Sequence, residues 1–158
     1  MNLEVAPLAV VAAQPADAHR LNALEQACFA LDRISLRSYQ RLLSRPSAKV
    51  LLVEDEGSDS APLLGSLVLL FRRRATTARV YSLAVSAQAR RRGLASLLLA
   101  AAEPTARAFG CSRLRAEIRR DNAASLAAFQ KAGFCVIGTY EDYYSDGMDA
   151  IRVEKIIK

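Results

Sequence analysis

Histidine, cysteine and aromatic residues are scarce in this sequence, and their scarcity limits the chemistry that it can carry. Its 158 residues include one histidine, three cysteines and no tryptophan. A single imidazole, His19, argues against a metal site built on several histidines, and we expect no metal cofactor. Cys28, Cys111 and Cys135 are odd in number and far apart, which argues against a disulfide framework and against paired zinc ligands. We expect all three to be reduced and to pack as small buried hydrophobes.

Long apolar runs are also missing. The stretch from Leu63 to Phe71 is among the longest and falls well short of the ~20 residues that a membrane-spanning helix needs. The start, Met1 to Glu4, lacks the basic and apolar pattern of a secretory signal. We therefore expect a cytoplasmic protein with no membrane partner. At this length, residues 1–158 are expected to form one domain with a continuous core.

The charge is unbalanced toward basic residues. Twenty-two basic and 16 acidic residues give a net charge of +6, which fits an anionic cofactor, a nucleic acid or a charged surface. Two arginine triplets, Arg72 to Arg74 and Arg90 to Arg92, carry much of the excess. Aromatic residues suited to base stacking are not interleaved with them, so no nucleic-acid partner is expected.

Hydrophobic periodicity predicts an alternation of helices and strands. The expected order is a strand, two helices, three antiparallel strands, and then helix, strand, helix, strand, strand. The expected strands cover 8–13, 49–54, 62–71, 76–86, 113–119, 134–140 and 150–157, and the expected helices cover 17–29, 35–45, 93–109 and 122–132. The strand at 113–119 must return parallel to the one before it. This order predicts an α+β fold with a mixed, mostly antiparallel sheet flanked by helices. Pro104 predicts a kink or break in the third helix.

A basic loop precedes the third helix. Arg90, Arg91, Arg92 and Gly93 lead into Leu94, Ala95 and Ser96, so a glycine lies where the unpaired amides of a helix N-terminus begin. Such amides, with the helix dipole and nearby arginines, favour a diphosphate. An ordinary helix start with solvated arginines is the alternative. The glycine patterns of nucleotide-hydrolysing and dinucleotide-binding loops do not occur here.

Three segments carry a family resemblance. Tyr81-Ser-Leu-Ala-Val-Ser86, Arg90-x-x-Gly-x-Ala95 and Asp121-Asn-x-x-Ser-Leu-x-x-Phe-x-x-x-Gly-Phe134 resemble the GNAT family of N-acetyltransferases. The similarity runs from about Leu3 to the end. Residues 119–134 and 143–150 most resemble the branch that acetylates the N-terminal alanine of ribosomal proteins. The resemblance implies a GNAT-like domain that uses acetyl-CoA as co-substrate.

The resemblance also implies cofactor-binding positions. The backbone of Leu83, Ala84 and Val85 matches the strand that pairs with the pantetheine arm. The loop from Arg90 to Ser96 matches the pyrophosphate-binding loop. Asn122 matches a cofactor-contacting asparagine, Ser125 lies one helical turn later, and Phe129 lies on the same cofactor-facing side. Asn122 is also suited to capping its helix.

The catalytic positions are less complete. Glu117 matches a glutamate thought to act as the base through a water molecule. Alternatively, it pairs with Arg115, with Arg119 or with a charge on a neighbouring strand. Phe129 stands where many members carry a tyrosine proposed to protonate the leaving thiolate, and a phenyl ring cannot donate that proton. The candidate replacements are Tyr140, Tyr143 and Tyr144, at least two of which we expect only to pack or to line the acceptor groove.

These features predict an acetyl-CoA-dependent N-acetyltransferase acting on a primary amine. A protein N-terminus is slightly preferred over a small-molecule amine or lysine because of the Tyr143-Tyr144 pair. One alternative is a catalytically weak acyl-CoA-binding or sensing domain, suggested by Phe129. Another, ranked last, is a basic nucleic-acid-binding protein. The sequence leaves the oligomeric state open, a homodimer included.

Overall fold

Seven segments rich in apolar and β-branched residues form one sheet. The computed structural model describes residues 8–55 and 62–157. The strands are β1 (Val10–Ala12), β2 (Ala48–Glu54), β3 (Leu63–Leu70), β4 (Thr77–Val85), β5 (Arg113–Arg119), β6 (Cys135–Tyr140) and β7 (Ala150–Ile156). The helices are α1 (Ala18–Cys28), α2 (Leu36–Ser44), α3 (Leu94–Ala108) and α4 (Ala123–Lys131), with short 3₁₀ turns η1 (Pro15–Asp17) and η2 (Ala87–Ala89). The predicted element order and the α+β class are confirmed.

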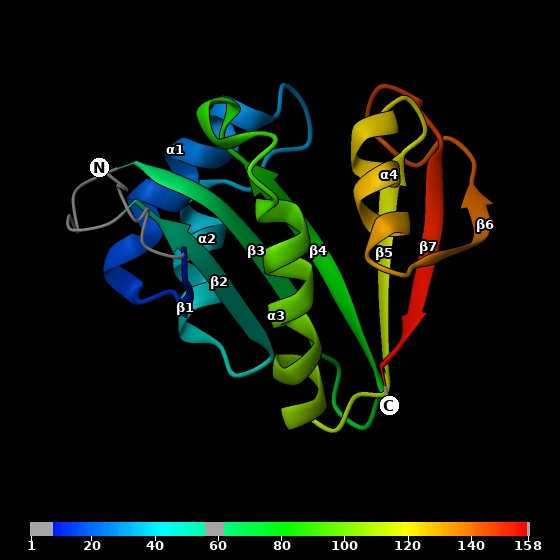
Figure 1. The fold of residues 1–158 in the computed structure, drawn as a ribbon, viewed down its shortest axis with the longest axis horizontal. Helices are drawn as coiled ribbons and strands as arrows, with labels where there is room; N and C mark the ends of the chain where they lie inside the picture. The colour runs from blue at the N-terminus through cyan, green and yellow to red at the C-terminus, as the bar shows by residue number, and fades with distance from the viewer. Residues whose placement is uncertain (1–7, 56–61, 158) are drawn as a thin grey trace, which may run out of the picture.

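The sheet separates two apolar cores. Helices α3 and α4 cover one face and α1 and α2 cover the other (Figure 1). On the first face, Leu98 and Leu99 of α3 are buried against Leu67 and Leu69 of β3. On the second face, Leu21 of α1 and Tyr39 of α2 pack with Val50, Leu52 and Val68. Burying both faces positions the loops of α1 and α3 at the same end of the central strands (Figure 1).

The strand order is β1-β2-β3-β4-β5-β7-β6. Strands β1 to β4 are antiparallel neighbours, and β5 pairs with β4 in parallel after the α3 crossover, as predicted. The closing hairpin folds back so that β7, the last strand in the chain, pairs with β5 and leaves β6 at the edge. Residues from the β6–β7 connection are thereby brought over the end of β5.

The two central strands separate along their length. The β3–β4 register shifts between Val68 and Leu69, and Tyr81 is the extra residue on β4. Pairing between β4 and β5 ends at Val80 and Ala116, although both strands continue. Beyond that point β4 and β5 diverge and leave a fork between them (Figure 1). The backbone edge of β4 in the fork has no β5 partner.

The sequence predicted a kink or a break at Pro104; helix α3 runs through this residue without a break, so the break is excluded. Proline at this position removes the amide donor for the carbonyl of Ala100. Both Ala100 and Pro104 lie on the exposed side of the helix. Water can therefore satisfy the carbonyl, and the buried leucines on the other side keep the helix continuous.

The prediction that all three cysteines are buried is wrong for Cys135. All three are free thiols, but only Cys111 is fully buried, Cys28 is half-buried, and Cys135 is exposed. Cys135 begins the edge strand β6, whose side chains Val136 and Ile137 are also exposed. An apolar run predicts burial only where a second layer covers it, and most of β6 is uncovered.

Candidate functional site

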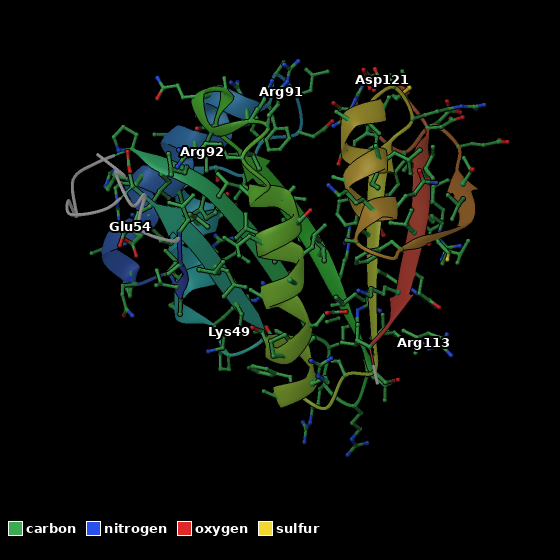
Figure 2. All side chains as sticks on the ribbon, in the orientation of Figure 1. Lys49, Glu54, Arg91, Arg92, Arg113 and Asp121 are labelled. Carbon is green, nitrogen blue, oxygen red and sulfur yellow. The ribbon has the colours of Figure 1, made fainter. Side chains whose placement is uncertain are left out.

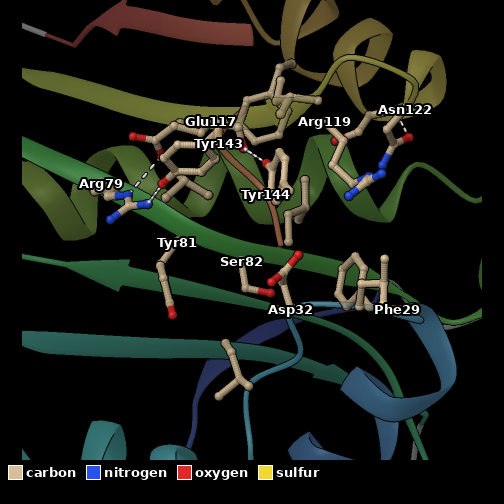
Figure 3. Close-up of a pocket in the computed structure, with 18 of the residues that line it drawn as sticks. Phe29, Asp32, Arg79, Tyr81, Ser82, Glu117, Arg119, Asn122, Tyr143 and Tyr144 are labelled. Carbon is tan, nitrogen blue, oxygen red and sulfur yellow. Dashed lines mark hydrogen bonds and ion pairs between the residues drawn. The ribbon is translucent and has the colours of Figure 1, made fainter. Parts of the chain in front are cut away.

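The fork between β4 and β5 contains a cavity of about 350 Å³. Its walls come from α1 and the loop that follows, from β4 and β5, from α4, and from the loop after β6 (Figure 3). Glu117, Tyr143 and Tyr144, the predicted catalytic residues, all line it. Segments far apart in the sequence therefore meet at this one place.

Glu117 projects from β5 into the cavity and holds an ion pair with the neighbouring strand. Its Oε2 accepts a hydrogen bond of 2.9 Å from Nε of Arg79 on β4. The same guanidinium donates through Nη2 to the phenol oxygen of Tyr143 at 2.7 Å (Figure 3). No hydrogen bond from the described part of the chain reaches Oε1 of Glu117. That oxygen is positioned to accept from a ligand or a water molecule.

The arginines flanking Glu117 on β5 pair elsewhere. Arg115 binds Glu154 of β7 at 2.6 Å, and Arg119 binds Asp146 at 2.7 Å. The predicted pairing of Glu117 with either of them is wrong, whereas the alternative of a charge on the neighbouring strand is confirmed by Arg79.

Tyr143 and Tyr144, from the β6–β7 connection, lie next to Glu117. Their rings contact edge to face with centroids 5.0 Å apart, and the Tyr144 hydroxyl donates to the Glu117 carbonyl at 3.4 Å. Burial raises the pKa of Tyr144 to about 12 and also raises the pKa of Tyr143. Both phenols therefore keep their protons at neutral pH. Tyr140 stacks on Tyr143 at 5.6 Å and does not line the cavity, as expected for a packing residue.

A buried carboxylate missed by the sequence analysis forms another part of the wall. Glu25 of α1 is 3% exposed and accepts hydrogen bonds from the Ile34 amide, the Tyr39 hydroxyl and the Ser82 hydroxyl. Burial raises its pKa in spite of these three donors. The contacts tie the loop after α1 and helix α2 to β4. A glutamate on the apolar face of a predicted helix was the available signal.

The loop before α3 has the predicted features of an anion site. Gly93 is the N-cap with φ of 75°, and Arg91 has φ of 69°. The first helical hydrogen bond runs from the Leu97 amide to the Gly93 carbonyl. The amides of residues 94–96 therefore have no carbonyl acceptor within the helix. A Cβ built on Gly93 meets no heavy atom within 4 Å. Open space in front of unpaired amides at a helix start fits a diphosphate.

Some of the remaining predicted cofactor-binding residues line the cavity, and the others lie outside it. Leu83, Asn122, Ser125 and Phe129 line the cavity, whereas Val85 and residues 90–96 do not. The Ala84 side chain is buried in the core against α1 and α2, so only its backbone is available. Figure 2 shows Arg91 and Arg92 near the N-terminal end of α3, beyond the fork.

The start of α4 is confirmed as a capped helix. Asn122 Oδ1 accepts from the Ser125 amide at 3.1 Å, and both side chains also border the cavity. Further along α4, Phe129 is 2% exposed and packs edge to face on Phe134 with centroids 5.0 Å apart. It presents a hydrocarbon ring to the cavity and has no proton to give.

Residues 8–55 and 62–157 contain neither a cluster of metal ligands nor a helix suited to a membrane. No cluster of three or more potential metal ligands occurs there. None of the helices in those ranges has the length and apolar character to cross a membrane.

Comparisons with known proteins agree with this geometry. The profile of the acetyltransferase (GNAT) family matches residues 18–134. Among solved structures, the ribosomal-protein-S18-alanine N-acetyltransferase from Escherichia coli superimposes with a TM-score of 0.82 at 21% identity, covering 96% of this chain and 95% of that one. Ard1 from Thermoplasma volcanium gives 0.81 at 24% identity, covering 96% and 98%. The NatC complex bound to Gag peptide and CoA gives 0.79 at 18% identity, covering 96% and 99%. No curated protein matches significantly by sequence.

Proposed function

Because the chain belongs to the acetyltransferase (GNAT) family and is an N-acetyltransferase, we propose that it acetylates a primary amine and prefers a protein N-terminus to a lysine or a small-molecule amine. One observation carries the proposal: the fork between β4 and β5 has Glu117 on one wall and an unpaired backbone edge on the other. A carboxylate and free amides on either side of one cavity suit acyl transfer to an amine.

Acetyl-CoA, the co-substrate of this family, would lie along the fork. It supplies a thioester whose carbonyl carbon is attacked by the amine. The edge of β4 at Leu83 to Val85 has no β5 partner and is available to hold its pantetheine arm. The Val85 carbonyl accepts a hydrogen bond from the Cys28 thiol at 3.4 Å. The amides of residues 94–96 and the open space at Gly93 are available to its pyrophosphate. Asn122 and Ser125 border the same channel from the side of α4.

Glu117 is the proposed base. Arg79 occupies its Oε2, which fixes the rotamer and leaves Oε1 to accept a proton from the amine through a water molecule. The carboxylate side chain is 18% exposed, so it is reachable from the cavity while held in place. The alternative, a purely structural ion pair with Arg79, predicts a loss of stability and no change in the pH profile of turnover.

Tyr143 is the better candidate for the proton donor. Its oxygen accepts from Arg79, so its own proton is free to be donated, and the guanidinium stabilises the phenolate that donation leaves. Tyr144 already directs its proton to the Glu117 carbonyl. We therefore assign proton donation to Tyr143 and groove lining to Tyr144.

Loops on both sides of the fork support a peptide acceptor. Asp32, in the loop after α1, accepts from the Ser145 amide and hydroxyl, the latter at 3.1 Å, and so links that loop to the β6–β7 connection. No cation within the described ranges pairs with Asp32, so its carboxylate is available to attract an ammonium group. Two of the structural neighbours act on or bind a polypeptide, the S18-alanine enzyme and the NatC complex with Gag peptide.

The second candidate function is a catalytically weak acyl-CoA-binding or sensing domain. Phe129 favours it, because a buried phenyl ring lines the cavity at the position where a phenol would deliver a proton. Loss of a general acid costs on the order of 10²–10⁴-fold in rate. Binding without turnover is therefore the expected behaviour if no tyrosine replaces it.

One experiment separates these functions. Purified protein is incubated with acetyl-CoA and, in parallel, with N-terminal peptides beginning with alanine or serine, with the same peptides blocked at the N-terminus but containing lysine, and with polyamines. Mass spectrometry should show one acetyl group on the free N-terminal peptides first. Acetylation of lysine or polyamine alone would contradict the acceptor preference. Tight acetyl-CoA binding with no product on any acceptor would favour the sensing domain.

A further inference from the structure

A second hollow, of about 490 Å³, lies at the opposite end of the central strands from the fork. It is bordered by the β3–β4 turn, by the residues just before β2, and by the C-terminal end of α3. Figure 2 shows Lys49 near this end, far from Arg91 and Arg92. The proposed acetyl-transfer site uses none of its residues.

The arginine triplet Arg72 to Arg74 is held on a defined turn beside this hollow. The Ala75 amide donates to the Arg72 carbonyl at 3.1 Å, and Arg74 adopts a left-handed conformation with φ of 66°. All three side chains are exposed. In the described ranges, no carboxylate pairs with any of them. Three guanidinium groups are thus presented together with their donors unused by protein acids.

An aromatic pair forms the floor of the hollow. Phe109 stacks on Phe71 with ring centroids 4.2 Å apart and an interplanar angle of 15°. Phe71 is buried, whereas Phe109 is 43% exposed. The Lys49 ammonium lies over the Phe109 ring, 5.6 Å from its centroid. Lys49 is itself exposed, so a base that stacks on Phe109 takes the place of this ammonium and leaves it beside the row of arginines.

The surrounding residues extend the positive charge. Arg45 donates to Ser47 and Arg107 donates to the Ile157 carbonyl, so neither charge is neutralised by those contacts. The C-terminal carbonyls of α3 disfavour an anion directly at the helix end. Anion contacts are therefore expected at the β3–β4 turn, with the helix end contributing the phenyl ring.

We propose that this hollow binds single-stranded nucleic acid, with phosphates on Arg72 to Arg74 and a base stacked on Phe109. The sequence predicted no such partner because no aromatic residue suited to stacking is interleaved with the triplet. Folding supplies one, since Phe109 comes from the far end of α3. An acidic peptide would use the arginines but not an exposed ring, and an anionic membrane calls for a protruding apolar surface, whereas this surface is concave.

The test is fluorescence anisotropy with a labelled oligouridine 12-mer and saturating CoA, which blocks the proposed pyrophosphate loop. The variant Arg72→Ala/Arg73→Ala/Arg74→Ala should lower the slope of log affinity against log salt by about 2, at about 0.7 per phosphate contact. Extrapolated from equal affinity at 1 M salt, that slope predicts binding about 50-fold weaker at 150 mM. Acetyl-transfer activity of this variant should be unchanged.

A matched triple variant at the other end, Arg90→Ala/Arg91→Ala/Arg92→Ala, removes the same charge and should leave oligouridine binding within twofold. Phe109→Ala should weaken binding about tenfold with an unchanged salt slope, because stacking carries no counterion release. The proposal is overturned by absence of binding at 50 mM salt or by equal losses in the two triple variants. It is also overturned by tighter binding of a polyglutamate peptide or of phosphatidylserine vesicles. None of these outcomes bears on acetyl transfer.

Discussion

Substitution of Gly93 by valine tests the assignment of the pyrophosphate loop. Gly93 has φ of 75°, and a Cβ at this position would point into space free of protein atoms within 4 Å. If a diphosphate lies there, the added side chain keeps it from the amides of residues 94–96. Losing two hydrogen bonds to a charged group at about 1.5 kcal/mol each corresponds to an affinity on the order of 100-fold weaker.

The chain contains a matched control for the strain that this substitution introduces. Gly110, just beyond the other end of α3, has φ of 80° and likewise no heavy atom within 4 Å of a built Cβ. A left-handed conformation costs a non-glycine residue about 1–3 kcal/mol, so Gly93→Val and Gly110→Val should destabilise the protein by similar amounts. Only Gly93→Val should weaken CoA binding.

Isothermal titration calorimetry with CoA and urea unfolding together separate the two effects. The expected result is a similar loss of unfolding free energy in both variants and a lower CoA affinity in one. A folded Gly93→Val protein that binds CoA as tightly as wild type would refute the loop assignment. Equal loss of CoA affinity in Gly110→Val would show that helix strain, and not occlusion of the loop, is responsible.

Further predictions concern the cavity residues. Glu117→Gln should lower kcat about 10²-fold, leave the KM for acetyl-CoA within twofold and abolish the acidic limb of the pH profile of kcat/KM; wild-type turnover at all pH values would make Glu117 structural. Tyr143→Phe should lower kcat by a similar factor with CoA affinity unchanged, whereas Phe129→Tyr should change kcat less than twofold. A gain in Phe129→Tyr together with full activity in Tyr143→Phe would place the acid on α4. Burial raises the folded pKa of Glu25 above its unfolded value, so its stabilising contribution is full below the unfolded pKa and falls as pH rises through the folded one. Urea unfolding from about pH 4 to pH 8 should therefore show wild type losing stability relative to Glu25→Gln, and a constant difference would contradict the raised pKa.

The sequence was sufficient to predict the local structure and to single out the residues of the loop before α3. Ser35 accepts from the Ser38 amide at the start of α2, as a helix-capping serine predicts, and Gly133 follows α4 with φ of 97°. The apolar spacing of α3 and the parallel return of β5 were also predictable. Each of these follows from residues close together in the chain or from a general rule of chain connection.

Contacts between distant segments could not be predicted in this way. Glu117 lines the cavity, but its partner Arg79 was not foreseen, because strand pairing fixes the partner and periodicity does not. The buried Glu25 has donors from three elements, whose convergence depends on helix packing. Cys135 is exposed because β7 inserts between β5 and β6, and hairpin signals do not specify which strand of the hairpin lies at the edge.

The extra residue at Tyr81 connects the sequence to the chemistry. Before it, Ala78 and Val80 face the core under α3; after it, Ser82 and Ala84 face α1 and α2. This change of face is what brings Ser82 to Glu25, while the pairing of β4 with β5 ends at Val80 and opens the fork. The side chain of Tyr81 is 46% exposed. That side chain lines the cavity, with the Arg79 guanidinium over its ring at 5.3 Å from the centroid. One surplus residue in β4 therefore creates both the unpaired edge proposed for acetyl-CoA and the wall that faces the acceptor.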